Sequence, residues 1–302
     1  MKSEMTKQTM RLSDFYHDES LIRDSSFSLL GYVDSGEKET LAYGDTYAYL
    51  VRARQNENVS CVITTGELAD YMDNAKGLIV SSMPRNTFFK LHNKLVEKDL
   101  IRLEIDYGIG KNCSIHPTAT ISKRSNVGDN VIINENVVIK DNVMIGDNTF
   151  IDVGAVIGCE GLLYITEDDK KISVRHAGGV KVGANVTILS NAVIARSINN
   201  SCLTEIGDYS IIGIAANIGH EARIGAKCVI SGNCVIARRA IVNDGASIES
   251  SAFVREHVMI GKGGQVKAGS IVVKDVDNNQ AVSGNFAMEH NRHLRLYIRK
   301  SK

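Results

Sequence analysis

Aliphatic side chains recur at every sixth position through most of the second half of the chain. The first frame starts at Ile115 and runs to Ile157, and the second runs from Val182 to Val272 with one break, at Asn200. A mostly small side chain follows four residues after each aliphatic; in the second frame these are Ala216, Ala222, Cys228, Cys234, Ala240, Ala246 and Ala252. A period of six fits neither an amphipathic helix nor simple strand alternation. It is the hexapeptide signature of a parallel β-helix.

The repeat also predicts which side chains face the interior. Three hexads make one triangular coil of about 18 residues, and roughly 24 hexads give about eight coils stacked at the usual strand spacing. The first and fifth positions of each hexad point inward, so Cys228 and Cys234 are expected to be small interior fillers. His220 and His257 are expected to project outward, and Glu221 to be a solvated charge that points elsewhere from His220.

Two segments interrupt the repeat. Residues 159–181 separate the two frames, which are one residue out of step, so a loop or hairpin is expected to leave the β-helix there. Residues 195–205, "ARSINNSCLTE", occupy the place of the missing aliphatic. Excursions from a rigid scaffold often carry binding groups.

The flanking segments have other periods. Residues 1–112 contain two apolar runs typical of buried strands, "VSCVITT" and "KGLIVSS", and a helical pattern in "NTFFKLHNKLVEK". We predict a mainly β protein with a small N-terminal α/β domain over 1–112, a β-helix over 113–275 and a tail with a short basic helix over 276–302.

Composition excludes several classes of function. Thirty-five basic residues balance thirty-five acidic ones, so no overall field attracts nucleic acid. The N-terminus lacks an apolar signal segment and no stretch reaches the length of a membrane span, which favours a cytoplasmic protein without membrane insertion. The six cysteines show no metal-ligand spacing, so no metal site is expected, and no nucleotide-binding or hydrolase motif is present.

The remaining candidate chemistry lies on the β-helix. Arg238 follows His220 by one coil, so it is expected directly above His220, with the Arg238 backbone amide one strand away. His257 follows two coils plus one residue after His220 and is expected near the same edge. Two imidazoles near the same edge of the β-helix favour a catalytic site there.

Residues 27–300 resemble the UDP-3-O-acylglucosamine N-acyltransferase family of lipid A synthesis and its relatives that acylate amino sugars on nucleotide carriers. The resemblance lies in "VSCVITT", "KGLIVSS", "NTFFKLHNKL", the repeat, "GCEGLLY", "GGVKVG" and "VSGNFAMEHNRHLR". It implies a left-handed coil and a homotrimer with its sites between adjacent β-helices.

The resemblance also implies roles for individual residues. His220 would accept a proton from the sugar amine as that amine attacks a thioester, with His257 as a second active-site histidine. An imidazole with an ordinary pKa of about 6.5 suits a base at neutral pH. A backbone N–H near Arg238 would bind the oxyanion. Tyr43 and Tyr49 would stack on the nucleotide base. Asn217 is a candidate amide partner of the substrate, and His176 could touch donor or sugar.

Departures from the family pattern shape the functional hypotheses. The segment "GIAAN" before His220 is less polar than in the lipid A enzymes, residues 195–205 are longer, and the C-terminal extension is short. These features favour transfer of a short acyl group, such as acetyl or 3-hydroxybutyryl, from acyl-CoA to a dTDP- or UDP-linked amino deoxysugar for O-antigen or surface polysaccharide. No permanently bound cofactor is expected. The alternatives are the lipid A enzyme itself, with acyl carrier protein (acyl-ACP) as donor, and a non-catalytic β-helix scaffold.

Overall fold

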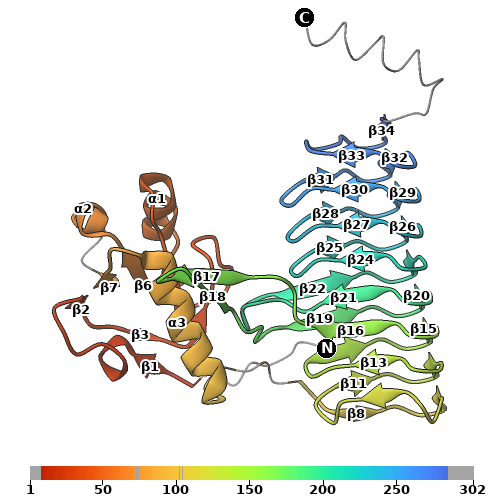
Figure 1. Ribbon diagram of the computed structural model, residues 1–302, viewed down its shortest axis with the longest axis horizontal. Helices are drawn as coiled ribbons and strands as arrows, with labels where there is room; N and C mark the ends of the chain where they lie inside the picture. The colour runs from red at the N-terminus through yellow and green to blue at the C-terminus, as the bar shows by residue number, and fades with distance from the viewer. Residues whose placement is uncertain (1–7, 73–74, 102, 104, 285–302) are drawn as a thin grey trace, which may run out of the picture.

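A triangular prism of parallel strands forms the larger part of the molecule, and a smaller α/β domain lies beside it (Figure 1). The computed structural model describes residues 8–72, 75–101, 103 and 105–284. The expected basic helix near the C-terminus lies outside these residues. Three parallel sheets of eight, eight and nine strands make the three faces of the prism.

Each face is a ladder of short strands. The first face contains β10 (Thr120–Ile121), β13 (Val138–Ile139), β16 (Val156–Cys159), β21 (Val193–Ala195), β24 (Asn217–Ile218), β27 (Val235–Ile236), β30 (Phe253–Val254) and β33 (Ile271–Val272). The second contains β8 (Gly108–Ile109), β11 (Asn126–Val127), β14 (Val143–Ile145), β19 (Gly179–Val182), β22 (Leu203–Ile206), β25 (Arg223–Ile224), β28 (Ile241–Val242) and β31 (Met259–Ile260). The third contains β9 (Ser114–Ile115), β12 (Ile132–Ile133), β15 (Phe150–Ile151), β20 (Thr187–Ile188), β23 (Ile211–Ile212), β26 (Val229–Ile230), β29 (Ser247–Ile248), β32 (Gln265–Val266) and β34 (Ala281–Val282).

The six-residue period translates directly into the strand register. Ile218 pairs with Ile236, and Ile236 with Val254, so each strand lies on the strand three hexads later. The aliphatic of each hexad and the small residue that follows it together fill the prism, where Cys228 and Cys234 are fully buried. The predicted parallel β-helix and its inward positions are confirmed. Strand pairing extends from Gly108 to Val282, a few residues beyond the expected 113–275 at each end.

The N-terminal domain is a five-stranded sheet in the order β2-β7-β6-β5-β4, flanked by helices. Its strands are β2 (Leu21–Arg23), β4 (Leu29–Leu30), β5 (Thr40–Tyr43), β6 (Val59–Thr64) and β7 (Gly77–Val80), and a small pair is formed by β1 (Met10–Arg11) and β3 (Ser26–Phe27). The helices are η1 (Leu12–Asp14), α1 (Tyr47–Gln55), α2 (Gly66–Ala69) and α3 (Pro84–Glu97). The two predicted strands and the predicted helix correspond to β6, β7 and α3. In the described ranges, no helix is both long and apolar enough to cross a membrane.

The segment between the two frames leaves the prism as a hairpin and joins it to the N-terminal domain. Its strands β17 (Tyr164–Glu167) and β18 (Lys170–Ser173) pair antiparallel and lie along α3 (Figure 1). Side chains of α3 bind the hairpin backbone: the Asn86 amide donates to the Thr166 carbonyl at 2.7 Å, and His92 Nε2 lies 2.9 Å from the Arg175 carbonyl. Leu163 and Ile165 enter the same apolar core as Phe88 and Leu95 of α3. The excursion is therefore a structural bridge.

Candidate active site

His220 lies on the turn between β24 and β25, at the corner of the prism that faces the N-terminal domain. Its side chain points away from the prism interior, as the repeat predicts, but it is only 4% exposed. The outward ring is nevertheless buried, because Gly161 and His176 of the first interruption pack against it. Gly161 of the first excursion packs so closely that a Cβ there would lie 2.9 Å from Cδ2 of His220.

Glu221 is the charged side chain next to His220. Its Oε2 lies 3.7 Å from Nδ1 of His220, an ion-pair distance longer than a hydrogen bond. Nδ1 is completely enclosed and has no hydrogen-bond partner among the described residues. The nitrogen that remains for a substrate is Nε2. The expectation of a solvated Glu221 pointing elsewhere was therefore wrong.

The Glu221 carboxylate is buried, and hydrogen bonds from both domains compensate for its burial. It accepts hydrogen bonds from the Tyr32 hydroxyl at 2.9 Å and from the Ile198 N–H at 3.2 Å, and its own N–H donates to Thr204 Oγ1 at 2.7 Å. Burial opposes its ionisation, but His220, Tyr32 and Arg239 hold the pKa of Glu221 below its ordinary value. The site thus contains a carboxylate able to stabilise a protonated His220 ring.

A local feature of the sequence could have identified Glu221. Glu221, Arg239 and His257 occupy the same corner in three successive coils, and all three have a positive φ, of 62°, 56° and 62°. Most other corners place asparagine or glycine in this left-handed conformation, which larger side chains rarely adopt. Three charged or titratable residues stacked at one corner, in successive coils, point to a site. Tyr32, which was also missed, has no such signal.

His176 packs against the His220 ring but does not line the two cavities described below. The rings meet edge to face with centroids 5.5 Å apart, and His176 is buried. Its Nε2 accepts from the Gly161 N–H at 3.2 Å, and its Nδ1 lies 3.2 Å from the Val174 carbonyl. Burial and the neighbouring His220 lower the pKa of His176 to about 4, so the ring is neutral near pH 7. The structure therefore places His176 as a support for the ring of His220.

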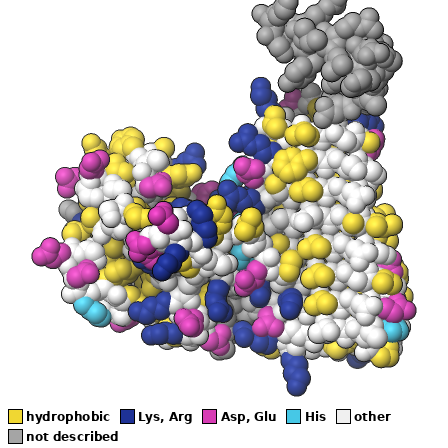
Figure 2. All heavy atoms as spheres, in the orientation of Figure 1, with side chains coloured by type: hydrophobic (Ala, Val, Ile, Leu, Met, Phe, Trp, Pro, Cys, Tyr) yellow, Lys and Arg dark blue, Asp and Glu magenta, His cyan; other side chains and the backbone are white. Residues whose placement is uncertain are grey.

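Two adjoining cavities, each about 360 Å³, open where the N-terminal domain meets this corner. One is lined by Tyr43, Tyr49, Arg52, His220, Arg238 and His257, among others. The other is lined by Cys202, Glu221, Arg223, Ile241 and His257, among others, and Tyr32 and Arg239 border both. Figure 2 shows basic side chains gathered between the two parts of the molecule. The structure thus brings together five of the seven predicted site residues.

The predicted positions around His220 differ in how far they agree with the structure. The coil register places Arg238 next to His220, and no hydrogen bond within the described residues uses the Arg238 N–H. Burial, Arg239 and Arg238 lower the pKa of His257. Tyr49 lies on α1 and lines the cavity that contains His220. Asn217 is exposed on the outer side of β24 and lines neither cavity, because strand residues just before the turn face another side of the prism.

The chain is similar to several solved structures. No family model and no curated protein matches the sequence. A solved UDP-N-acetylglucosamine acyltransferase from Bacteroides fragilis is 23% identical, with a TM-score of 0.53, and the match covers 65% of this chain and 75% of that one. The acyltransferase of the same name from Arabidopsis is 24% identical over 63% of this chain and 72% of its own, with a TM-score of 0.45. The likeness to the Bacteroides fragilis structure shows the fold.

Proposed function

We propose that the protein is a nucleotide-sugar N-acyltransferase that uses an acyl thioester, with His220 as its general base. The observation that carries this proposal is the buried His220–Glu221 pair at a cavity shared by two domains. Tyr43 and Tyr49 at the same cavity offer faces on which a nucleotide base can stack. Likeness in fold to an enzyme that acylates UDP-N-acetylglucosamine supports the same substrate class.

The proposed reaction proceeds through a tetrahedral intermediate. Nε2 of His220 takes a proton from the sugar amine while the amine nitrogen attacks the thioester carbonyl carbon. Glu221 stabilises the imidazolium that forms, and the free N–H of Arg238 donates to the oxyanion. The C–S bond then breaks, and the thiolate takes the proton from His220. The products are an amide and a free thiol.

The acceptor we favour is a dTDP- or UDP-linked amino deoxysugar, and the donor a short acyl-CoA. The alternative is acyl-ACP with the lipid A precursor. The polar, arginine-rich lining of both cavities fits the anionic nucleotide and donor better than a long apolar chain. This observation favours the short donor.

Release of free thiol tests the proposal. Acyl-CoAs from acetyl to long-chain, and acyl-ACP, are each paired with UDP- and dTDP-amino sugars. We expect turnover with at least one pair and a loss of roughly 10²–10⁴-fold in His220→Ala. The control is His116→Ala, a histidine exposed on the prism far from the cavities in sequence and structure. Turnover by no pair, or turnover equal in both variants, would refute the enzyme hypothesis.

A further inference from the structure

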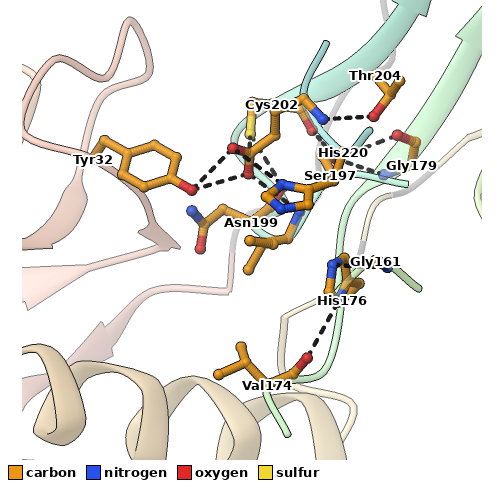
Figure 3. A network of polar contacts seen from close by, with 12 residues as sticks. Tyr32, Gly161, Val174, His176, Gly179, Ser197, Asn199, Cys202, Thr204 and His220 are labelled. Atoms are coloured by element: carbon orange, nitrogen blue, oxygen red, sulfur yellow. Dashed lines mark hydrogen bonds and ion pairs between the residues drawn. The ribbon is translucent and has the colours of Figure 1, made fainter. Parts of the chain in front are cut away.

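Tyr32 of the N-terminal domain reaches across the domain boundary to Glu221 (Figure 3). Its hydroxyl lies 2.9 Å from Oε2 and 3.1 Å from Oε1, although the two residues are 189 positions apart. Burial and the carboxylate raise the pKa of Tyr32 well above its ordinary value. The hydroxyl is therefore protonated at neutral pH and acts as the donor.

The Tyr32 hydroxyl lies within hydrogen-bond distance of both oxygens of Glu221, but their other partners differ. Besides Tyr32 at 3.1 Å, Oε1 accepts from two groups of the prism, the Ile198 N–H at 3.2 Å and the Cys202 thiol at 3.5 Å. Among the described residues, Oε2 faces only two donors, the Tyr32 hydroxyl at 2.9 Å and Nδ1 of His220 at 3.7 Å. Tyr32 and His220 thus share one oxygen, and Tyr32 is the closer of the two.

The Tyr32 ring is itself held in place. The Arg239 guanidinium lies over the ring, 4.2 Å from its centroid, and also pairs with Asp34 at 3.4 Å. Arg239 belongs to the coil above Glu221, whereas Asp34 follows Tyr32 in the N-terminal domain. Contacts from both domains therefore fix the direction in which the hydroxyl points.

We propose that Tyr32 is a positioning residue that sets the basicity of His220 through Glu221. The hydroxyl donates to Oε2 and so keeps that oxygen from moving to hydrogen-bond distance of Nδ1. In this way the N-terminal domain reduces the stabilisation of the protonated His220 ring by Glu221. The inference about catalysis rests on the proposed function, whereas the inference about titration of the ring does not.

Removal of the hydroxyl has a defined electrostatic consequence. In Tyr32→Phe, Oε2 loses its nearer donor and turns to Nδ1, which stabilises the charged ring. We therefore expect the ring of His220 to titrate at higher pH in this variant than in wild type. The substitution leaves in place the other charged or titratable side chains around the site: His176, Cys202, Arg196, Arg223, Arg238, Arg239, His257, Tyr43, Tyr49, Asp34, Asp45 and Arg52.

Titration of His220 by NMR is the direct test. Histidine is ¹³C-labelled at Cε1, and the His220 resonance is assigned by its loss in His220→Ala. We expect an upward shift of the midpoint in Tyr32→Phe and no such shift in Tyr47→Phe, an exposed tyrosine of α1. In a Glu221→Gln background, Tyr32→Phe is expected to have no further effect. An unchanged or lower midpoint in Tyr32→Phe, or an equal shift in the Glu221→Gln background, overturns the proposal.

Two further measurements keep the inference testable. If Tyr32→Phe does not fold, 3-fluorotyrosine at position 32 preserves the ring and donates a stronger hydrogen bond. The titration midpoint of His220 is then expected to fall, and a rise would contradict the proposal.

With active enzyme, the acid limb of the kcat–pH profile is expected to move to higher pH in Tyr32→Phe, while KM for the nucleotide sugar changes less than about twofold. A role in domain docking alone predicts a higher KM and an unmoved limb. Failure of acyl transfer with every donor refutes the proposed function but leaves the NMR result interpretable.

Discussion

The orientation of His220, the proposed base, depends on neighbouring groups that take no part in the proposed reaction. His220 has no hydrogen bond at Nδ1 within the described residues, so its orientation depends on packing: Gly161 on one side, His176 at its edge and Glu221 near Nδ1. A turn of the β-helix positions the backbone of His220, and Gly161 and His176 of the excursion over residues 159–181 enclose its ring. Small changes around the ring are therefore expected to affect catalysis more than folding.

Gly161→Ala tests this dependence on packing. The new methyl group would lie 2.9 Å from Cδ2 of His220 and 3.3 Å from Nε2 of His176, so the His220 ring is displaced. We expect kcat to fall by about 10²-fold, the cost of a displacement near 1 Å, with a thermal midpoint close to wild type. Gly66→Ala is the matched control, because its methyl group would meet only Val80, at 3.7 Å. Equal kcat in the two variants would contradict the packing argument.

Glu221→Gln tests the carboxylate separately from the space it fills. The amide retains an oxygen for Tyr32 and Ile198 but carries no charge to stabilise the imidazolium. We expect a loss of about 10²-fold or more in kcat with the fold retained. Circular dichroism establishes folding and the thiol assay gives kcat. A kcat within a factor of two of wild type would exclude Glu221 from the proposed mechanism.

At the scale of elements, the hairpin β17–β18 and helix α3 form a junction that encloses histidines. His92 of α3 and His176 after β18 are both buried, and burial is the main cause that lowers the pKa of each from 6.5 to about 4. Between these values the unfolded chain binds protons that the folded chain does not. The stability from each histidine is thus complete above pH 6.5 and is lost as the pH falls toward 4.

Denaturant unfolding from pH 7 to pH 4 checks this prediction. Each lowered pKa corresponds to about 3 kcal/mol at most across the window. His92→Gln keeps a donor for the Arg175 carbonyl but removes the titration, so its free energy of unfolding is expected to decline less steeply with falling pH. His116→Gln, on the exposed surface, is expected to follow the wild-type slope. Parallel slopes for His92→Gln and wild type would show that His92 is not the titrating group.

The elements also show why the sequence predicted the prism better than the site. Inward positions such as Ile218 and Cys228 follow a strict local period, and stacking fixes their neighbours without reference to the rest of the chain. His220 was predictable by the same register. Tyr32 and Glu221 meet through a contact between domains, and Gly161 and His176 lie in an excursion without a period. No local pattern specifies such contacts.

At the scale of the whole molecule, one face of the prism is apolar on its outside at every strand except β10 and β24, whose outward residues are Thr120 and Asn217. Its outward positions include Val138, Val156, Val193, Val235, Phe253 and Ile271. Hydrophobic side chains run down the visible face of the prism in Figure 2, where Figure 1 draws β13 to β33. This face ends at the corner that carries His220, so a second copy packed on it would lie beside the cavities. The face therefore supports the proposed homotrimer with shared sites.

Val235→Glu and Val229→Glu distinguish this face from its neighbour. Both valines are on outer strand positions and are similarly exposed, at 36% and 40%, but Val229 belongs to β26 of the third face. We expect wild type to have about three times the chain mass of 32.9 kDa in light scattering, and Val235→Glu to dissociate, because a carboxylate buried at an interface loses its hydration. Dissociation is expected to abolish thiol release, because it removes the second prism that the trimer would place beside the two cavities. Val229→Glu is expected to keep both mass and activity. A wild-type monomer that is fully active would refute the shared site, and dissociation by Val229→Glu alone would move the interface to the third face.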